Sequence, residues 1–321
     1  MSSQPAGITV AVATCGRPQS LARCLEALAS GTVLPSEVIV VDQAAAAGGR
    51  AVVSAAARLR ARYVEQPRLG LSASRNLALA CATQPLLAVT DDDCAPAPGW
   101  IAAITAGLRR SPEPAAVTGP IVPIGERPPG GHAVSLRSST TACDHRAPML
   151  PWDAGSGANF AAARSLLLSH GGWDERLGVG SRGQAAEDAD LLYRILRSGG
   201  IVRYEPGAVV LHEWQTWERR LQTRSSYAHG VGALCGLWLR RGDAFALRML
   251  GAYARMHAGE LRAALERRDR GGATEHARAL AGIAPGMLYG LTTRSPGPGL
   301  SERRAPGRTS SRPAGRWPGG P

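Results

Sequence analysis

Short apolar runs alternate with amphipathic stretches through the first 93 residues of the chain. The apolar runs have the length and β-branched content of buried strands, and they cover residues 8–13, 37–42, 62–65 and 86–90. Helical patterns lie between them, the last one opening near residue 70 with a serine as its N-cap. This β-α-β-α-β-α-β order predicts an α/β protein with a doubly wound, mainly parallel sheet.

Three carboxylates, Asp91, Asp92 and Asp93, follow directly on the strand predicted at residues 86–90. Adjacent carboxylates repel one another, so a partly buried cluster is costly unless a cation neutralises it. Hard oxygen ligands favour Mg²⁺ or Mn²⁺, which commonly arrive with the phosphates of a substrate. An acidic turn that caps the helix expected near Pro98 is the alternative, and the cluster alone leaves both open.

Several polar residues should meet at one edge of this sheet. Thr14, Asp42 and the cluster at 91–93 all lie where predicted strands end, and ligands of doubly wound sheets bind beyond these carboxyl ends. A dinucleotide-binding protein would need a Gly-rich turn after the first strand. That turn holds only Gly16, followed by Arg17, so we exclude this class.

The middle of the chain contains a second acidic pair. Residues 120–157 are rich in Pro, Gly, Ser and Thr, which predicts either disorder or a lid that faces a substrate. A helix follows at 187–196, and Glu187 and Asp188 occupy its first turn, where the helix dipole favours carboxylates. Simple capping would explain one of the two equally well. His212 ends a predicted strand. Its imidazole could be a third metal ligand or a hydrogen-bond donor to a phosphate, or it could simply cap the strand.

Charge and cysteine spacing exclude other classes. The net charge is +12, but every basic residue counted is an Arg, which indicates a coding bias rather than a nucleic-acid footprint. The six cysteines form no C-x-x-C pair, which argues against a zinc site or a disulfide framework. We therefore expect no nucleic-acid partner.

The ends of the chain bear on its location. Residues 1–5 lack the features of a signal peptide, and the apolar run 231–239 is too short to span a bilayer. Helices are expected at 243–268 and 274–280, and the composition from 292 onward predicts disorder. We expect a cytoplasmic protein without a transmembrane segment, with at most a weak peripheral contact at the inner membrane face.

An ordered set of motifs carries a family resemblance. The motifs, in chain order, are Thr14 with Arg17-Pro18, Val40-Val41-Asp42, Gly70 to Asn76, Asp91 to Asp93, Gly171-Gly172-Trp173-Asp174-Glu175, Glu187 to Leu191 and His212. In this order and spacing, residues 7–215 resemble a non-processive, bacterial-type family 2 glycosyltransferase with the GT-A fold. We expect three regions: a GT-A domain at 1–215, a helical extension at 216–291 and a disordered tail at 292–321.

The resemblance implies a role for each matching residue. It places the nucleotide-sugar donor against seven residues: Thr14, Arg17, Asp42, Arg75, Asp91, Asp92 and Asn159. Thr14 and Asp42 would contact the nucleoside, Arg75 the phosphates, and Asp91 and Asp92 the ribose. Asp93, with Asp91 and His212, would hold Mg²⁺ or Mn²⁺. Asp188 would be the general base beside Glu187.

The implied reaction transfers a single sugar to a hydroxyl acceptor with inversion at the anomeric carbon. The acceptor would be a small molecule, a glycan or a lipid-linked compound. Processive relatives carry a Gln-x-x-Arg-Trp element, which residues 215–219 only imitate. Two alternatives are a nucleotidyltransferase, which should show a basic Gly-rich phosphate loop after the first strand, and a catalytically silent binding protein that kept the fold.

Overall fold

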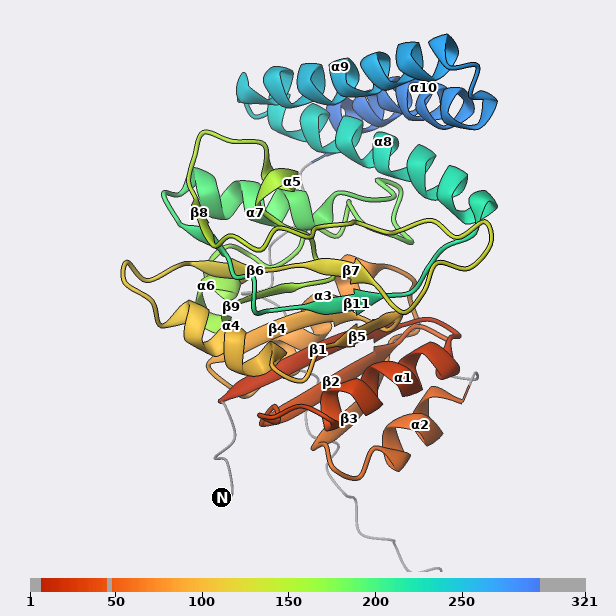
Figure 1. The fold of residues 1–321 in the computed structure, drawn as a ribbon. Coiled ribbons are helices and arrows are strands. Elements are labelled where there is room, and N and C mark those ends of the chain that lie inside the picture. Colours follow the sequence, from red (N-terminus) through yellow and green to blue (C-terminus); the bar gives the residue numbers. More distant parts are fainter. Residues whose placement is uncertain (1–6, 45–47, 295–321) are drawn as a thin grey trace, which may run out of the picture.

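A computed structural model describes residues 7–44 and 48–294 of the chain. The predicted alternation of strands and helices is present in the first half of the chain (Figure 1). Its elements are β1 (Ile8–Thr14), α1 (Pro18–Ala29), β2 (Glu37–Asp42), α2 (Gly49–Ala55), β3 (Ala61–Glu65), α3 (Leu71–Cys81), β4 (Leu86–Asp91), β5 (Cys94–Pro96) and α4 (Trp100–Leu108). The N-cap of α3 is Gly70 rather than the predicted serine, and Ser72, inside the helix, donates to the carbonyl of Leu177.

The second half adds short strands and long helices. They are β6 (Ala116–Thr118), β7 (Ile121–Pro123), β8 (Cys143–His145), α5 (Pro151–Ala154), β9 (Phe160–Ala163), α6 (Arg164–Ser169), α7 (Glu187–Arg197), β10 (Val202–Tyr204), β11 (Val210–His212), α8 (Trp217–Leu239), α9 (Phe245–Glu266) and α10 (Arg270–Thr292). The region 120–157, predicted to be disordered or a lid, therefore contains β7, β8 and α5.

The main sheet has eight strands in the order β3-β2-β1-β4-β9-β6-β10-β8. Strands β3, β2, β1 and β4 are parallel, as predicted. Strand β9 runs antiparallel between β4 and β6, and β8 is antiparallel to β10. The register sets Thr14 beside Asp42 and Ala13 beside Asp91. The expected convergence of these strand ends is confirmed.

A second sheet has three strands in the order β5-β11-β7. Its strand β5 begins directly after the acidic cluster at residues 91–93. Its antiparallel register sets His212 opposite Cys94. The backbone N–H of Glu213 also donates to the carbonyl of Asp93 at 3.0 Å. These main-chain bonds bring His212 to Asp93 although 119 residues (212 − 93) separate them in the sequence.

Helices cover both faces of the main sheet. Alternate residues of β1 point to opposite sides, because side chains in a strand have a period of two. Val10 and Val12 pack with α1 and α4, where Leu25 and Trp100 are buried. Ala11 lies in the opposite apolar cluster, to which α3, α6 and α7 contribute. Two buried layers therefore fix the sheet and the positions of its strand ends.

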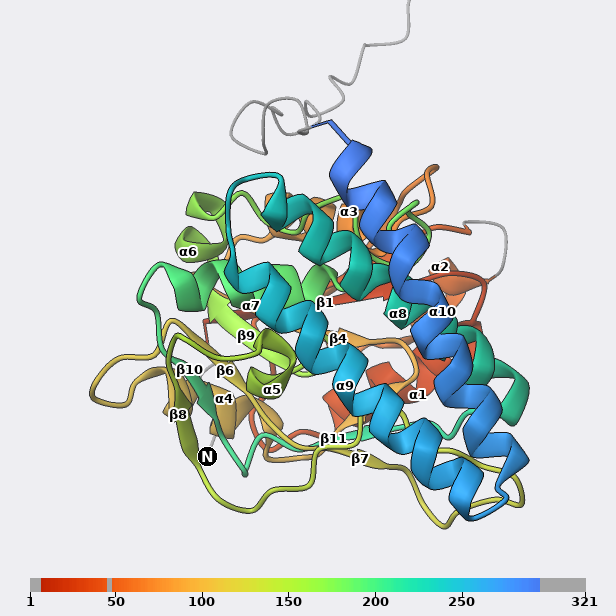
Figure 2. The same ribbon diagram turned by 90° about the horizontal axis from the view of Figure 1, so that it is seen from above.

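The C-terminal helices α8, α9 and α10 form a separate layer above α5 and α7 (Figures 1 and 2). The sequence predicted α9, missed α8 and made α10 too short, since Pro285 and five glycines weaken the helical pattern of residues 270–292. A third apolar cluster, which includes Leu234, Met249 and Tyr193, joins this layer to α7. The helical layer is thus bound to the element that carries Glu187 and Asp188.

Within residues 7–44 and 48–294, every helix falls short of the length and apolarity needed to cross a bilayer. The predicted disordered tail begins at 292, and its residues from 295 onward lie outside the described part of the chain.

Candidate active site

Polar residues from β1 and β4 meet at the carboxyl end of the main sheet. The Thr14 hydroxyl donates to Oδ2 of Asp92 at 2.7 Å. Arg17, just before α1, donates to Oδ2 of Asp93 at 2.7 Å and also forms an ion pair with Asp92. The guanidinium of Arg17 therefore offsets part of the repulsion within the acidic cluster.

Asp92 is the most deeply buried member of this cluster. It is 0% exposed, and burial raises the pKa of its carboxyl to about 7, although Arg17 and the Thr14 hydroxyl act in the opposite direction. Asp92 thus supports the loop between β4 and β5 from within the protein, whereas Asp93 is partly exposed.

Asp93 and His212 come together at the edge of the small sheet. Nε2 of His212 lies 3.5 Å from Oδ1 of Asp93, and potential ligand atoms of Asp93, Cys94 and His212 lie within 4.8 Å of one another. Nδ1 of His212 donates to the carbonyl of Glu213 at 2.9 Å, since a carbonyl can only accept. This bond leaves Nε2 of the neutral ring without a proton and directed toward Asp93.

Arg75 connects the end of β4 with the start of α7. Its side chain is 3% exposed, Nη1 donates to Oε1 of Glu187 at 2.8 Å, and Nη2 donates to Oδ1 of Asp91 at 3.0 Å. A Cβ at residue 157 would lie 2.7 Å from Nη1 of Arg75. Gly157 therefore allows the backbone before β9 to pass directly beside this guanidinium.

The first turn of α7 presents two carboxylates in different settings. Glu187 is buried, whereas Asp188 is partly exposed. Burial, followed by the charge of Asp188, raises the pKa of Glu187 to about 7, and Arg75 opposes the shift. Asp188 accepts hydrogen bonds from the backbone N–H groups of Gly157 and Ala189, both at 2.8 Å. These bonds fix the orientation of the Asp188 carboxylate.

A pocket of about 730 Å³ opens between this centre and the C-terminal helices. Five residues predicted from the sequence line it: Arg75, Asp91, Glu187, Asp188 and His212. Thr14, Arg17, Asp92 and Asp93 belong to the hydrogen-bonded group at the strand ends behind it. The structure therefore joins nearly all of the predicted residues in one region.

Asp42 and Asn159 have other partners. The Asp42 carboxylate is buried and accepts from the Tyr63 hydroxyl and the Ala44 N–H, both at 2.8 Å. The amide of Asn159 is also buried, and it contacts the carbonyls of Pro120 and Ala208 and Nε1 of Trp100. The three contacts of Asn159 hold α4 against the strand connections, and its contact with the donor stays a prediction.

Two pocket residues were not singled out from the sequence. Arg137 lies in the region 120–157 and donates to the carbonyl of Gly155 at 3.0 Å. Tyr227 lies on α8, is partly exposed and lines the pocket. Nothing in the local sequence marks either residue, because both reach the pocket through contacts between distant segments.

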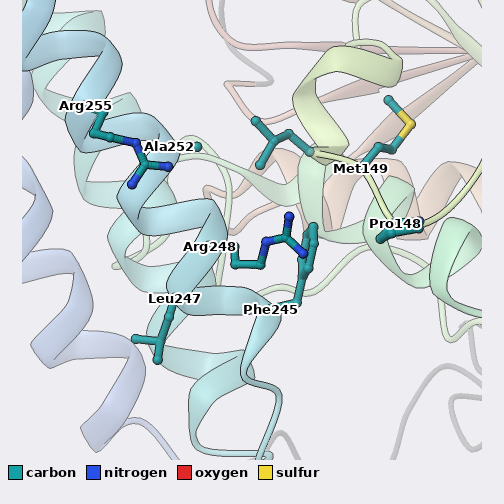
Figure 3. A pocket seen from close by; sticks show the side chains of 8 residues that line it. Pro148, Met149, Phe245, Leu247, Arg248, Ala252 and Arg255 are labelled. Carbon is teal, nitrogen blue, oxygen red and sulfur yellow. The ribbon is translucent and has the colours of Figure 1, made fainter.

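A second pocket, of about 500 Å³, lies away from these carboxylates, between α9 and the segment before α5 (Figure 3). Met149 and Pro148 face the first turns of α9, where Phe245 and Arg248 lie close together. The described residues that line this second pocket are apolar or cationic, and none of them carries a carboxylate or a nucleophilic group.

The sheet order, with carboxylates beyond its parallel strands and an acidic start of α7, is that of the GT-A fold. Solved structures that share this fold include the following two. Mannosyltransferase PcManGT from Pyrobaculum calidifontis, in complex with GDP-Man and Mn²⁺, has a TM-score of 0.60 and 20% identity, covering 91% of this chain and 88% of that chain. S. aureus TarS 1–349 in complex with UDP-GlcNAc has a TM-score of 0.54 and 14% identity, covering 86% and 90%.

Residues 9–164, just under half of the chain, match the family model described as glycosyl transferase family 2. The chain is similar to Pre-mycofactocin glycosyltransferase from two strains of Mycobacterium tuberculosis, CDC 1551 / Oshkosh and H37Rv, with 31% identity over 202 residues. The match covers 61% of this chain and spans 41% of the length of those relatives.

Proposed function

We propose that this protein transfers a single sugar from a nucleotide-diphosphate sugar to a hydroxyl acceptor, with inversion at the anomeric carbon and with the help of a divalent cation. The observation that carries the proposal is the shared pocket of Asp188, Glu187, Arg75, Asp91 and His212. It combines a partly exposed carboxylate with cationic and metal-ligating groups. An inverting displacement needs these components on opposite sides of the anomeric carbon.

Asp188 is the proposed general base. Its carboxylate faces the pocket and is oriented by two backbone N–H groups. It takes the proton of the acceptor hydroxyl as that oxygen attacks the anomeric carbon and the nucleoside diphosphate leaves from the opposite face. Glu187 suits this role less well, because it is buried and bound to Arg75. We propose instead that Glu187 positions Arg75 and helps to orient the acceptor in the pocket.

The residues near Asp93 fit a divalent cation. A carboxylate oxygen and an imidazole nitrogen suit Mn²⁺ or Mg²⁺, and the bond from Nδ1 to Glu213 leaves Nε2 of His212 available. Burial raises the pKa of the Cys94 thiol well above its usual value, which makes it a poor ligand for a hard cation. Asp93 and His212, with Asp91, would hold the ion, which supplies charge neutralisation for a diphosphate.

The donor would occupy the strand ends. We propose Thr14 and Asp42 for the nucleoside side, and Arg17, Arg75 and Asp91 for the ribose and phosphates, with the buried Asp92 holding Thr14 and Arg17 in place. The mannosyltransferase and TarS structures contain GDP-Man and UDP-GlcNAc respectively, so guanine and uracil donors are the first to test. We propose a GT-A domain at residues 1–215 and a helical extension at 216–291. The extension, which contains α8 to α10, would close the acceptor side of the pocket.

The two alternatives are less well supported. A nucleotidyltransferase would need a basic, Gly-rich phosphate loop after β1, but Arg17 in this turn is paired with Asp92 and Asp93. A silent binding protein would have no need for the buried network that joins Arg75 to Asp91 and Glu187, because burying charges is costly.

Donor hydrolysis followed by proton NMR tests the proposal. In this assay water takes the place of the acceptor, so none has to be supplied. The protein is incubated with UDP-, GDP- and dTDP-sugars of known anomeric configuration, with Mn²⁺ or with EDTA. We expect Mn²⁺-dependent release of the nucleoside diphosphate and a sugar whose first-formed anomer is opposite to that of the donor. Retention of configuration, or equal rates in EDTA, would contradict the inverting or the metal-dependent part respectively.

A further inference from the structure

The pocket extends beyond Asp188 along one face of α8. The side chains that α8 contributes recur at helical spacing: Arg220, Thr223, Arg224, Tyr227 and Val231. Tyr253 and Met256 of α9 and the segment 133–137 complete this part of the pocket. We call it the α8 arm. It belongs to the helical layer above the sheet, which Figure 1 shows over α5 and α7.

The α8 arm begins beside the proposed base. A Cβ on Gly230 would lie 2.7 Å from Ala185, two residues before Glu187, so α8 touches the chain at the start of α7. Tyr227, Asp188 and Glu187 line the same pocket. Arg224 and Arg220 follow at three and seven residues from Tyr227. With a rise of 1.5 Å per residue, they lie about 5–10 Å farther along the helix.

Two arginines of the α8 arm share one carboxylate. Nε of Arg220 donates to Oε2 of Glu275 at 2.7 Å, and Nε of Arg224 donates to Oε1 at 2.8 Å. Glu275 is buried on α10, and its pKa is lowered because the hydrogen bonds and charges of these arginines outweigh the opposing effect of burial. Two guanidiniums against one carboxylate leave one positive charge without a counterion in this group.

Arg137 adds a further positive charge to the same wall. It contacts the carbonyls of Trp152 and Gly155, and among the described residues it forms no ion pair with a carboxylate. Its Nε is buried without a hydrogen-bond partner, and burial lowers the pKa of the guanidinium. A buried donor atom of a cation is costly to leave unused unless a ligand completes its bonding.

We propose that the α8 arm is the acceptor subsite and that it selects acceptors carrying an anionic group, a carboxylate or a phosphate, about 5–10 Å from the hydroxyl that receives the sugar. This inference rests on the proposed glycosyl transfer, because it takes Asp188 as the place of the hydroxyl. Arg224, Arg220 and Arg137 bind the anion, and Tyr253 and Met256 line the space around the body of the acceptor. The subsite distinguishes acidic acceptors from neutral ones of the same shape.

A matched pair of small probes tests the inference without turnover. 4-(Hydroxymethyl)benzoate carries a hydroxyl and a carboxylate at opposite ends of a ring, and 4-(hydroxymethyl)benzamide replaces only the charge. Binding of both to the full chain is titrated by NMR at constant ionic strength, with Mn²⁺ and GDP or UDP present. We expect the acid to bind at least about tenfold tighter than the amide, since hydrogen bonds between charged groups are the strong ones.

Arg224→Gln should remove most of this preference. Arg220 still pairs with Glu275 in this variant, so the helical layer should stay folded, which thermal unfolding checks. Arg219→Gln is the matched control, because Arg219 is exposed on the same helix and does not line the pocket. Arg220→Gln provides a second variant of the same kind, in which Glu275 keeps Arg224.

Three results decide the matter. Loss of the acid preference in Arg224→Gln, with nucleoside diphosphate affinity unchanged and Arg219→Gln normal, supports an acceptor subsite. Weaker nucleoside diphosphate binding in Arg224→Gln overturns it, because the arginines would then serve the donor. Equal binding of acid and amide to the unaltered protein also overturns it. Failure of glycosyl transfer itself appears separately, as absent donor hydrolysis with both binding measurements intact.

Discussion

The backbone N–H of Gly157 donates to Oδ2 of Asp188 at 2.8 Å. The same glycine lies so close to Arg75 that a Cβ would come within 2.7 Å of Nη1. One backbone segment therefore orients the proposed base and borders the guanidinium that joins Asp91 to Glu187. The position of Asp188 depends on the turn before β9 as well as on α7, which makes the pocket sensitive to changes in both elements.

Replacing Asp188 by Asn should lower kcat by about 10²-fold or more and leave the donor Kd nearly unchanged. The amide keeps the shape of the side chain and can still accept the N–H of Gly157, but it cannot take the acceptor proton. Steady-state transfer or donor hydrolysis gives kcat, and calorimetry with the nucleoside diphosphate and Mn²⁺ gives the Kd.

Glu187→Gln is the comparison for that experiment. It removes a charge one residue away and weakens the contact with Arg75, so it should lower kcat less than Asp188→Asn and acceptor binding more. A reversed order of the two variants would make Glu187 the base. If neither variant slows turnover, the proposed inverting mechanism is wrong.

Replacing Asp93 by Ala should abolish the tightening of nucleoside diphosphate binding by Mn²⁺. The variant loses a carboxylate ligand but keeps the ion pair of Arg17 with Asp92, so the loop should remain folded. We expect the Kd in Mn²⁺ to rise at least about tenfold and the Kd in EDTA to stay the same. His212→Ala should behave similarly, since Nε2 points toward Asp93.

Glu213→Gln serves as the control for these two variants. It changes a carboxylate next to His212 that pairs with Arg23, and it keeps the carbonyl that orients the imidazole. Calorimetric titration with Mn²⁺ should therefore match the unaltered protein. An Asp93→Ala variant that binds the diphosphate normally in Mn²⁺ would remove Asp93 from the metal site.

The sequence predicted the parts of the site that depend on single strands and on one helix turn. Apolar runs mark β1, β2 and β4, and parallel strands end at one edge, so Thr14 and Asp92 could be expected to meet. Their hydrogen bond follows from adjacency in the sheet. Glu187 and Asp188 were identifiable because acidic residues open a helix with a clear apolar face.

Other features could not be predicted because they arise from packing between distant segments. Strand β9 lies antiparallel between β4 and β6, and its alanine-rich sequence carries no sign of direction. The hydrogen bonds from the Asn159 amide to the carbonyls of Pro120 and Ala208 likewise join segments that are distant in the sequence. Arg137 and Arg224 reach the pocket only because α8 and the region 120–157 cover it.

Gly286→Ala should destabilise the helical layer. A Cβ there would lie 2.0 Å from the carbonyl oxygen of His229, so α8 and α10 would have to move apart. Overpacking of this kind costs about 1–3 kcal/mol. Gly259→Ala is the matched control within α9, because nothing lies within 4 Å of the added Cβ, and it should stabilise by about 0.5–1 kcal/mol. Thermal unfolding of both variants measures the two effects, and equal midpoints would contradict the prediction.

The buried carboxyl of Glu187 should make the stability of the protein depend on pH in a particular direction. Its pKa in the folded protein is raised from 4.5 to about 7. The folded state therefore binds more protons than the unfolded state between these values, and the contribution of Glu187 to stability falls as pH rises through this window. Glu187→Gln removes this contribution and leaves all other titrating groups in place.

The midpoint of thermal unfolding, measured for both proteins from pH 5 to pH 8, isolates this effect. We expect the difference between Glu187→Gln and the unaltered protein to become more favourable to the variant as pH rises, because only the unaltered protein must keep a buried carboxylate ionised at pH 8. The raised pKa of Glu187 already includes the opposing effect of Arg75, so the loss of this contact in the variant leaves the sign of the trend unchanged. A difference that instead moves against the variant across this range would show that the ion pair with Arg75 outweighs burial and the charge of Asp188.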